Sequence, residues 1–399
     1  MLVKQHQKLI TNRIKVAFIA PCLGLGGADA LMQGLIKYAH HLEFTGIAVS
    51  GELQLDHVRW FEKCMHWSVP VHQQRMKQTF PGINYHESWG HAVYNAVKDA
   101  NIIITWSQPN IHEALGSVDL PVIEYAQNSD EGAKAICASN VGSVHYHAAC
   151  SKAARRSFEG EDQIKVIYNG IDPGRVAPRK GRDLQRKVWG IKPEQKLLLF
   201  MGRLVKEKHP HAVLQALTKL PEDWCGVFVG EGTEQPSLFN DAKRFVPNRT
   251  CFVRPEYHVG DILAAADCFM LPSDFEGHPL SLMEAMLAGV PTVYTDFEVM
   301  TELHELFGPI GTMVPRCSES DIYATAVLEA TAETEDALIK VNTAREAVWQ
   351  NFTLPTIANE WEQFVEWCLF DFYRKRRFST IYPARNESPM QHAEIRNGM

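Results

Sequence analysis

Short apolar runs alternate with amphipathic stretches along the first part of this chain. The runs are five to seven residues long, which is typical of buried strands, and longer stretches with helical spacing lie between several of them. Predicted strands cover residues 14–20, 46–50, 101–105, 121–125, 144–149 and 164–168, and predicted helices include 28–41 and 87–98. This alternation predicts a mostly parallel sheet with helices on both faces.

The same alternation begins again after a stretch rich in Gly, Pro and charge at residues 169–182, which is typical of a domain edge. Predicted strands then cover residues 196–201, 226–229, 250–253, 264–272 and 290–295, and predicted helices cover 211–220, 234–245, 259–266, 279–289, 318–332 and 335–351. A further amphipathic helix is expected over 356–372. The chain is therefore predicted to contain two α/β domains.

The bulk composition agrees with two globular domains. A chain of 399 residues is too long for one ordinary core, and 45% hydrophobic with 22% charged residues is typical of a globular protein. The net charge of −7 gives no electrostatic case for nucleic-acid binding. Nine cysteines without CxxC pairs, a polar N-terminus and no bilayer-length apolar run favour a cytoplasmic setting.

One basic cluster raises the question of a membrane. Residues Arg374–Arg377 precede a polar tail, and such clusters contact anionic lipid when they are large enough. Four charges are at the low edge of that range, so a solvated helix end is the favoured interpretation and peripheral contact with the inner face of a membrane the alternative.

Two glutamates eight positions apart form the most informative pattern. Glu276 lies in the loop after an apolar strand, and Glu284 lies in the first turns of the helix that follows. Ligands of α/β domains collect beyond the carboxyl ends of the strands, where two carboxylates accept hydrogen bonds from the hydroxyls of a sugar or a ribose. Two solvated surface glutamates are the plain alternative.

A basic loop follows the first strand of the second domain. Gly202 allows a tight exit from the strand, and Arg203 and Lys208 follow in the loop. A planar guanidinium with a mobile ammonium is the pairing expected for a diphosphate. A simple salt bridge between Arg203 and Glu207 is the alternative.

Two glycine-rich turns also follow strands. Gly232 belongs to the turn at residues 229–233, and Gly26 and Gly27 close the turn at 24–27, where bare amides at a helix N-terminus suit an anion. Ordinary turns use the same residues. No Walker loop, HExxH or GxSxG motif is present, so we predict no metal site and no serine-nucleophile catalysis.

Taken together, these motifs resemble family 4 of the retaining glycosyltransferases (glycosyl transferases group 1). The resemblance rests on residues 26–29, 166–172, 202–208, 229–232 and 276–286, in that order. It implies the GT-B fold, in which two Rossmann-like domains face each other. The implied division is 1–172 for the acceptor-binding domain, 173–354 for the nucleotide-sugar domain, 355–375 for a helix crossing back and 376–399 for the tail.

The resemblance also implies roles for individual residues. Arg203 and Lys208 would bind the donor diphosphate, Glu276 the donor sugar and Glu284 the ribose. The implied catalytic residues are Glu276, Arg203 and Lys208. The remaining implied substrate-binding residues are Gly26, Gly27, Gln127, Asn128, Gly202, Gly232, Arg254, Gly277, His278, Leu280, Ser281 and Glu284. No cofactor or metal is expected, because basic residues and helix dipoles take its place.

Departures from the family pattern affect sugar and acceptor recognition. His278 and Pro279 stand where many members have Phe-Gly, and Pro279 has no N–H to offer a ligand. Gln127 or Asn128 stands where many members have a histidine, and an amide does no acid–base chemistry.

Three hypotheses therefore stand. The leading one is a retaining transferase that moves a sugar from a UDP- or GDP-sugar to a hydroxyl of a glycan, a lipid or a small molecule. The others are a non-catalytic subunit that binds sugar nucleotides and a nucleotide-sugar epimerase on the same fold.

Overall fold

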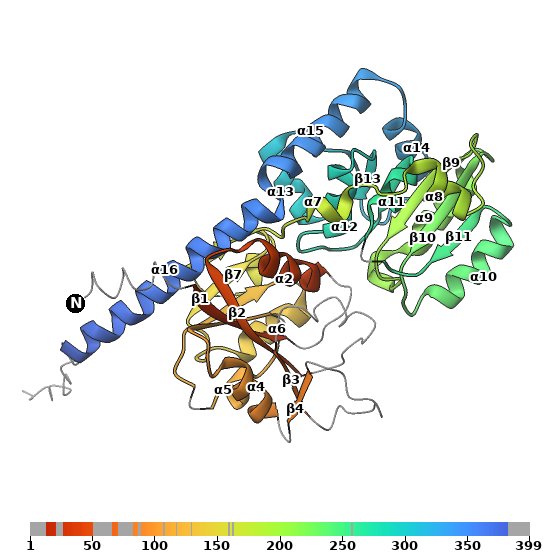
Figure 1. Cartoon of the computed structure of the whole chain (residues 1–399). Coiled ribbons are helices and arrows are strands. Elements are labelled where there is room, and N and C mark those ends of the chain that lie inside the picture. Colours follow the sequence, from red (N-terminus) through yellow and green to blue (C-terminus); the bar gives the residue numbers. More distant parts are fainter. Residues whose placement is uncertain are drawn as a thin grey trace, which may run out of the picture.

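The computed structural model describes residues 13–20, 27–50, 66–70, 83–86, 89–106, 108–116, 118–128, 130–158, 160–161, 163–256 and 258–381. Within these ranges the chain forms two parallel sheets with helices packed against them (Figure 1). The prediction of two α/β domains is confirmed.

The first sheet contains eight strands in the order β4-β3-β2-β1-β5-β6-β7-β8, and every neighbouring pair is parallel. Its strands are β1 (Ile14–Ala20), β2 (Leu42–Val49), β3 (His66–Pro70), β4 (Ile83–His86), β5 (Ile102–Thr105), β6 (Val122–Ala126), β7 (Tyr146–Ala149) and β8 (Ile164–Val166). Its helices are α2 (Gly27–Tyr38), α4 (Trp89–Val97), α5 (Ile111–Leu115), α6 (Glu131–Ser139) and the 3-10 turn η2 (Ala154–Ser157). The strand order reverses between β1 and β5, which places a ligand crevice at their carboxyl ends.

The second sheet contains six parallel strands in the order β11-β10-β9-β12-β13-β14, the order of a Rossmann fold. Its strands are β9 (Lys196–Met201), β10 (Trp224–Val229), β11 (Thr250–Val253), β12 (Cys268–Leu271), β13 (Thr292–Thr295) and β14 (Thr312–Val314). Its helices are α7 (Pro173–Val176), α8 (Arg182–Val188), η3 (Lys206–Lys208), α9 (Pro210–Lys219), α10 (Gln235–Phe245), α11 (Gly260–Ala265), α12 (Leu280–Leu287), α13 (Glu298–Phe307), α14 (Ser320–Ala330) and α15 (Glu335–Asn351). Here the order reverses between β9 and β12.

The last helix, α16 (Leu354–Ile381), starts beside the second domain and completes the core of the first (Figure 1). Ile357, Trp361, Val365 and Cys368 are fully buried on one face of it, at helical spacing, against the first sheet. The helix is longer than the predicted range 356–372. In the part of the chain that the structure describes, no helix has the length and apolarity to cross a membrane.

Most of the basic cluster near the end of α16 is engaged by acidic side chains. Arg374 and Lys375 contact Asp371 at 2.8 and 2.7 Å, and Arg376 pairs with Asp119 through both guanidinium nitrogens. The side chain of the fourth residue of the cluster lies outside the described residues. These ion pairs favour the interpretation of a charged helix end.

Candidate functional site

Lys208 and Glu276 meet at the point where the second sheet reverses its order. Lys208 lies in the loop after β9 and Glu276 in the loop after β12, and their Nζ and Oε1 atoms are 2.5 Å apart. Ser273 donates a hydrogen bond from its Oγ to the same carboxylate oxygen at 2.8 Å. Two of the predicted catalytic residues, 68 positions apart in the sequence, therefore form one charged centre at a topological switch point.

The two loops that carry this centre are also fastened to each other. The backbone N–H of Asp274 donates to the carbonyl of Glu207 at 3.0 Å, and the Asp274 carboxylate lies 2.7 Å from Nε2 of His209. Arg203, the third predicted catalytic residue, is two-thirds exposed and contacts Glu207 at 3.3 Å. Its guanidinium is therefore held only at the surface and is available to a bound anion.

The glycines of the basic loop and the neighbouring turn pack directly against one another. A Cβ atom on Gly230 would lie 1.9 Å from the carbonyl oxygen of Gly202, and one on Gly232 would lie 2.2 Å from that of Leu204. Both separations are far inside van der Waals contact, so only glycine fits. Gly232, predicted as a ligand-binding residue, therefore has a packing role that places the turn after β10 against the basic loop.

Glu284 is a buried carboxylate on α12, and the structure gives it a partner that the sequence did not suggest. Its Oε1 lies 3.0 Å from Nε of Arg175, and both side chains are almost fully buried. Burial raises the pKa of Glu284, and Arg175 acts in the opposite direction. Arg175 was missed because it lies in the segment interpreted as a domain edge. Leu280 and Ser281 form the first turn of the same helix.

The first domain contacts the site through the loop after β6. A Cβ atom on Gly277 would lie only 1.7 Å from the carbonyl oxygen of Gln127, so the Glu276 loop touches the first domain here. The Gln127 side chain accepts a hydrogen bond from Nδ2 of Asn169 at 3.2 Å, and its own amide nitrogen is buried without a partner among the described residues. The carbonyl of Asn128 accepts from Oγ of Ser157 at 2.6 Å.

His278 follows Gly277, and its ring packs against aromatic side chains of both domains. Its ring is 4% exposed and lies between the rings of Tyr168 and Phe352, with centroid separations of 5.3 and 5.0 Å. Burial lowers its pKa to about 3, so the ring is neutral. The structure therefore places His278 in the packing between the domains.

Two other predicted residues, Arg254 and Gly27, lie at the margin of the site, and a third, Gly26, is not among the described residues. Arg254 is almost fully exposed, 3.7 Å from Glu231. Gly27 is the first residue of α2, and Gly26 lies outside the described residues. Within the described ranges, no three or more His, Cys, Asp or Glu side chains gather in a way that would hold a metal ion.

Helix α13 forms a second contact between the domains that the sequence did not predict. The Glu302 carboxylate accepts hydrogen bonds from the backbone N–H of Lys152 at 3.1 and 3.3 Å and from the hydroxyl of Tyr168. One turn earlier, the Glu298 carboxylate accepts hydrogen bonds from both terminal guanidinium nitrogens of Arg156. The two domains are thus joined by charged hydrogen bonds beside the candidate site.

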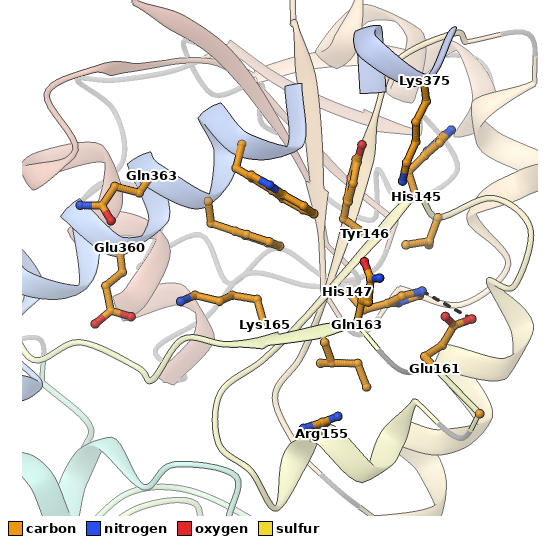
Figure 2. A pocket seen from close by; sticks show the side chains of 15 residues that line it. His145, Tyr146, His147, Arg155, Glu161, Gln163, Lys165, Glu360, Gln363 and Lys375 are labelled. Atoms are coloured by element: carbon orange, nitrogen blue, oxygen red, sulfur yellow. Dashed lines mark ion pairs between the residues drawn. The ribbon is translucent and has the colours of Figure 1, made fainter. Parts of the chain in front are cut away.

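A separate cavity of about 780 Å³ lies in the first domain between α16 and strands β7 and β8 (Figure 2). Both signs of charge line it, with Lys165 and Arg155 opposed by Glu360 and Glu161. Its lining includes neither Lys208 nor Glu276, so this cavity is separate from the candidate catalytic site.

A known family model matches most of the second domain. Residues 181–345 match the family model described as "Glycosyl transferases group 1". The match lies within the second domain of this chain and agrees with the resemblance drawn from its motifs.

Two relatives illustrate how far the sequence similarity extends. The UDP-Gal:alpha-D-GlcNAc-diphosphoundecaprenol alpha-1,3-galactosyltransferase of Escherichia coli is 33% identical over 147 residues, covering 34% of this chain and 37% of the relative. The N-acetyl-alpha-D-glucosaminyl L-malate synthase of Bacillus anthracis is 27% identical over 204 residues, covering 50% and 52%. The matches span about a quarter to a half of the length of such curated relatives.

Solved structures resemble the chain over nearly its whole length. Anabaena HepE, crystallised with UDP and glucose, gives a TM-score of 0.72 at 19% identity, covering 89% of this chain and 100% of HepE. WaaG, a glycosyltransferase involved in lipopolysaccharide biosynthesis, gives 0.63 at 16% identity, covering 88% and 99%. The prediction of the GT-B fold is confirmed.

Proposed function

We propose that this chain is a retaining glycosyltransferase that moves a sugar from a nucleotide diphosphate sugar to an acceptor hydroxyl. The observation that carries the proposal is the contact of Lys208 with Glu276 at the switch point of a domain that matches the glycosyl transferases group 1 model. A cation for a diphosphate and a carboxylate for sugar hydroxyls stand side by side there.

In this proposal, different site residues bind different parts of the donor. Lys208 and Arg203 bind the diphosphate and stabilise the negative charge that develops as it leaves. Glu276 accepts hydrogen bonds from the donor sugar, and Glu284 accepts them from the ribose. Without ligand, Lys208 and Glu276 satisfy each other, and a donor replaces part of that contact with its own phosphate and hydroxyl groups.

The acceptor side is built by the first domain. Gln127 has a buried amide N–H without a partner among the described residues, and such a donor is stabilised when a sugar hydroxyl accepts from it. An amide takes up no proton, so the leaving phosphate is the base for the acceptor hydroxyl. The acceptor attacks from the face that the diphosphate leaves, which retains the configuration at the anomeric carbon.

Because HepE was crystallised with UDP, UDP-glucose is the first donor to test, followed by a GDP-sugar. The experiment measures donor-dependent transfer in EDTA by wild type, Lys208→Ala and Glu276→Ala, with Gly90→Ala as a variant away from the site. We expect at least a hundredfold loss in both site variants. Activity that survives in both would overturn the proposal.

The same assays separate the alternatives. Nucleotide binding without turnover on a panel of acceptors would indicate a non-catalytic subunit, and conversion of the donor sugar without acceptor would indicate an epimerase. The expected setting is cytoplasmic. Contact of the cluster at residues 374–377 with anionic lipid stays a prediction, and sedimentation with phosphatidylglycerol vesicles tests it.

A further inference from the structure

The ion pair of Arg175 and Glu284 lies deeper than Arg203, the exposed cation of the candidate nucleotide site. The Arg175 side chain is 12% exposed and that of Glu284 is 4% exposed, whereas Arg203 is 67% exposed. Their charged atoms are 3.0 Å apart. A buried carboxylate stays ionised only when a cation or hydrogen-bond donors compensate its lost hydration, so the partner matters more here than at the surface.

Arg175 is held in place by a short helix that both domains fasten. Asp172 caps α7 by accepting from the N–H of Gly174 at 2.9 Å. From the first domain, Lys37 and Tyr38 at the end of α2 donate to the same carboxylate at 2.9 and 2.8 Å.

The second domain fastens the other end of α7. The carbonyl of Arg175 accepts from the N–H of Val259 at 3.2 Å. A Cβ atom on Gly260 would lie 2.3 Å from the carbonyl oxygen of Ala177, so α11 packs directly against the end of α7. Both ends of this four-residue helix are therefore fixed, which fixes the backbone position of Arg175.

The charges around Glu284 explain what the arginine does. Burial raises the pKa of Glu284, Arg175 lowers it, and Asp172 raises it slightly further. The hydrogen bonds that Asp172 receives hold its own pKa below the ordinary value despite burial, so that carboxylate stays negative. On its other side α12 packs against α15, whose buried side chains include Ala344, Ala347 and Val348. Arg175 is the one cation that acts on Glu284 among the described residues.

We propose that Arg175 is a positioning residue for the nucleotide, which keeps Glu284 ionised and aimed so that ribose hydroxyls donate to it. The inference rests on the proposed function, because it assigns the ribose to Glu284. An ionised carboxylate accepts stronger hydrogen bonds than a carboxylic acid. Loss of Arg175 therefore weakens nucleotide binding by allowing Glu284 to become protonated. The affinity of such a variant should for this reason depend on pH.

The test measures UDP affinity by calorimetry between pH 6 and pH 9 in wild type, Arg175→Met, Arg175→Lys and Glu284→Gln. In Arg175→Met we expect at least tenfold weaker binding at pH 6 and recovery towards the wild-type value as the pH rises. Arg175→Lys keeps the charge and restores most of the affinity at every pH. Glu284→Gln stays weak throughout.

Arg186→Met is the matched control, because Arg186 is another buried arginine of the same domain that pairs with a carboxylate, Asp267 at 3.1 Å. It lowers stability without changing the pH dependence of UDP binding. Arg175→Met binding like wild type at every pH, or weakened equally at every pH, would overturn the proposal.

A second readout needs no nucleotide. Without Arg175, the folded-state pKa of Glu284 rises further above its unfolded value, so stability is lost as the pH increases. The melting temperature of Arg175→Met should fall relative to wild type from pH 5 to pH 9, and Arg175→Met/Glu284→Gln should not show this fall. An equal fall in both would contradict the pairing. If wild type binds neither UDP nor GDP, the proposed function fails, and this stability comparison still decides whether Arg175 holds Glu284 ionised.

Discussion

Replacing Gly277 with alanine tests whether the two domains must touch for the reaction. The new Cβ atom would lie 1.7 Å from the carbonyl oxygen of Gln127 and 2.8 Å from Sγ of Cys150, whereas ordinary contact begins at 3.4 Å. One obstacle is backbone, so the Glu276 loop has to retreat by roughly 1.7 Å, the difference between contact and clash.

A displacement of this size separates the groups that the two domains bring to the reaction. A misplacement of about 1 Å costs on the order of a hundredfold in rate, which corresponds to about 2.7 kcal/mol in the activation barrier. We therefore expect Gly277→Ala to lower kcat by at least a hundredfold. The affinity for UDP should change by less than about threefold, because Glu284 and Lys208, which would bind UDP, belong to the second domain.

The assay combines initial transfer rates with calorimetric titration of UDP. Gly90→Ala is the matched control, because a Cβ atom there meets no other atom within 4 Å. A kcat for Gly277→Ala within threefold of wild type would refute the reasoning, since the two loops would then not be in contact in the working enzyme. An equal loss of UDP affinity and kcat would also refute it, since the damage would lie within the second domain.

Two further predictions concern stability. Glu124 is buried with one oxygen bonded to Nδ2 of Asn140 at 2.7 Å, and burial raises its pKa to about 7, above the ordinary 4.5. The folded-state pKa exceeds the unfolded one, so wild type should lose about 3 kcal/mol of unfolding free energy between pH 4.5 and pH 8 that Glu124→Gln keeps, as measured by urea denaturation. Arg186→Met removes the hydrogen bonds that a buried guanidinium donates to Asp267 and to the carbonyls of Ala265 and Lys192, and should cost about 3 kcal/mol. An unchanged melting temperature in this variant would contradict the role given to that pair.

The fold was predictable wherever apolar runs were continuous and bounded by turn residues. The bounds of β1, β9, β11 and α15 match the predicted ranges. In β1 and β9 most residues are buried, and burial on both faces makes such strands largely apolar. Helix α13 was missed. It has an amphipathic pattern, but it follows β13 after only two residues, Asp296 and Phe297, and no Ser, Thr or Asn stands at its start.

The candidate site was predictable in its loops and less so in its partners. Lys208 follows β9 and Glu276 follows β12, and these two strands are neighbours at the point where the strand order reverses. The position of each residue directly after its strand was therefore enough to predict that they meet. Glu302 contacts the other domain, and Arg175 pairs with Glu284, which is far from it in the sequence. No local pattern encodes which distant side chain a buried charge will meet. His278 reads as polar in the sequence, yet its environment of two aromatic rings makes it part of the packing.

The path of the chain through α16 has a consequence for synthesis on the ribosome. The core of the first domain includes Trp361, Val365 and Cys368, which follow the whole second domain in the sequence. After β8 has been translated, more than 170 further residues must be made before α16 can cover the apolar face of the first sheet. The second domain, whose strands and helices are contiguous in the chain, is complete before that helix emerges. Folding is thus expected to proceed from the inserted domain outwards, and a chain cut after the first sheet would expose the surface that α16 normally covers.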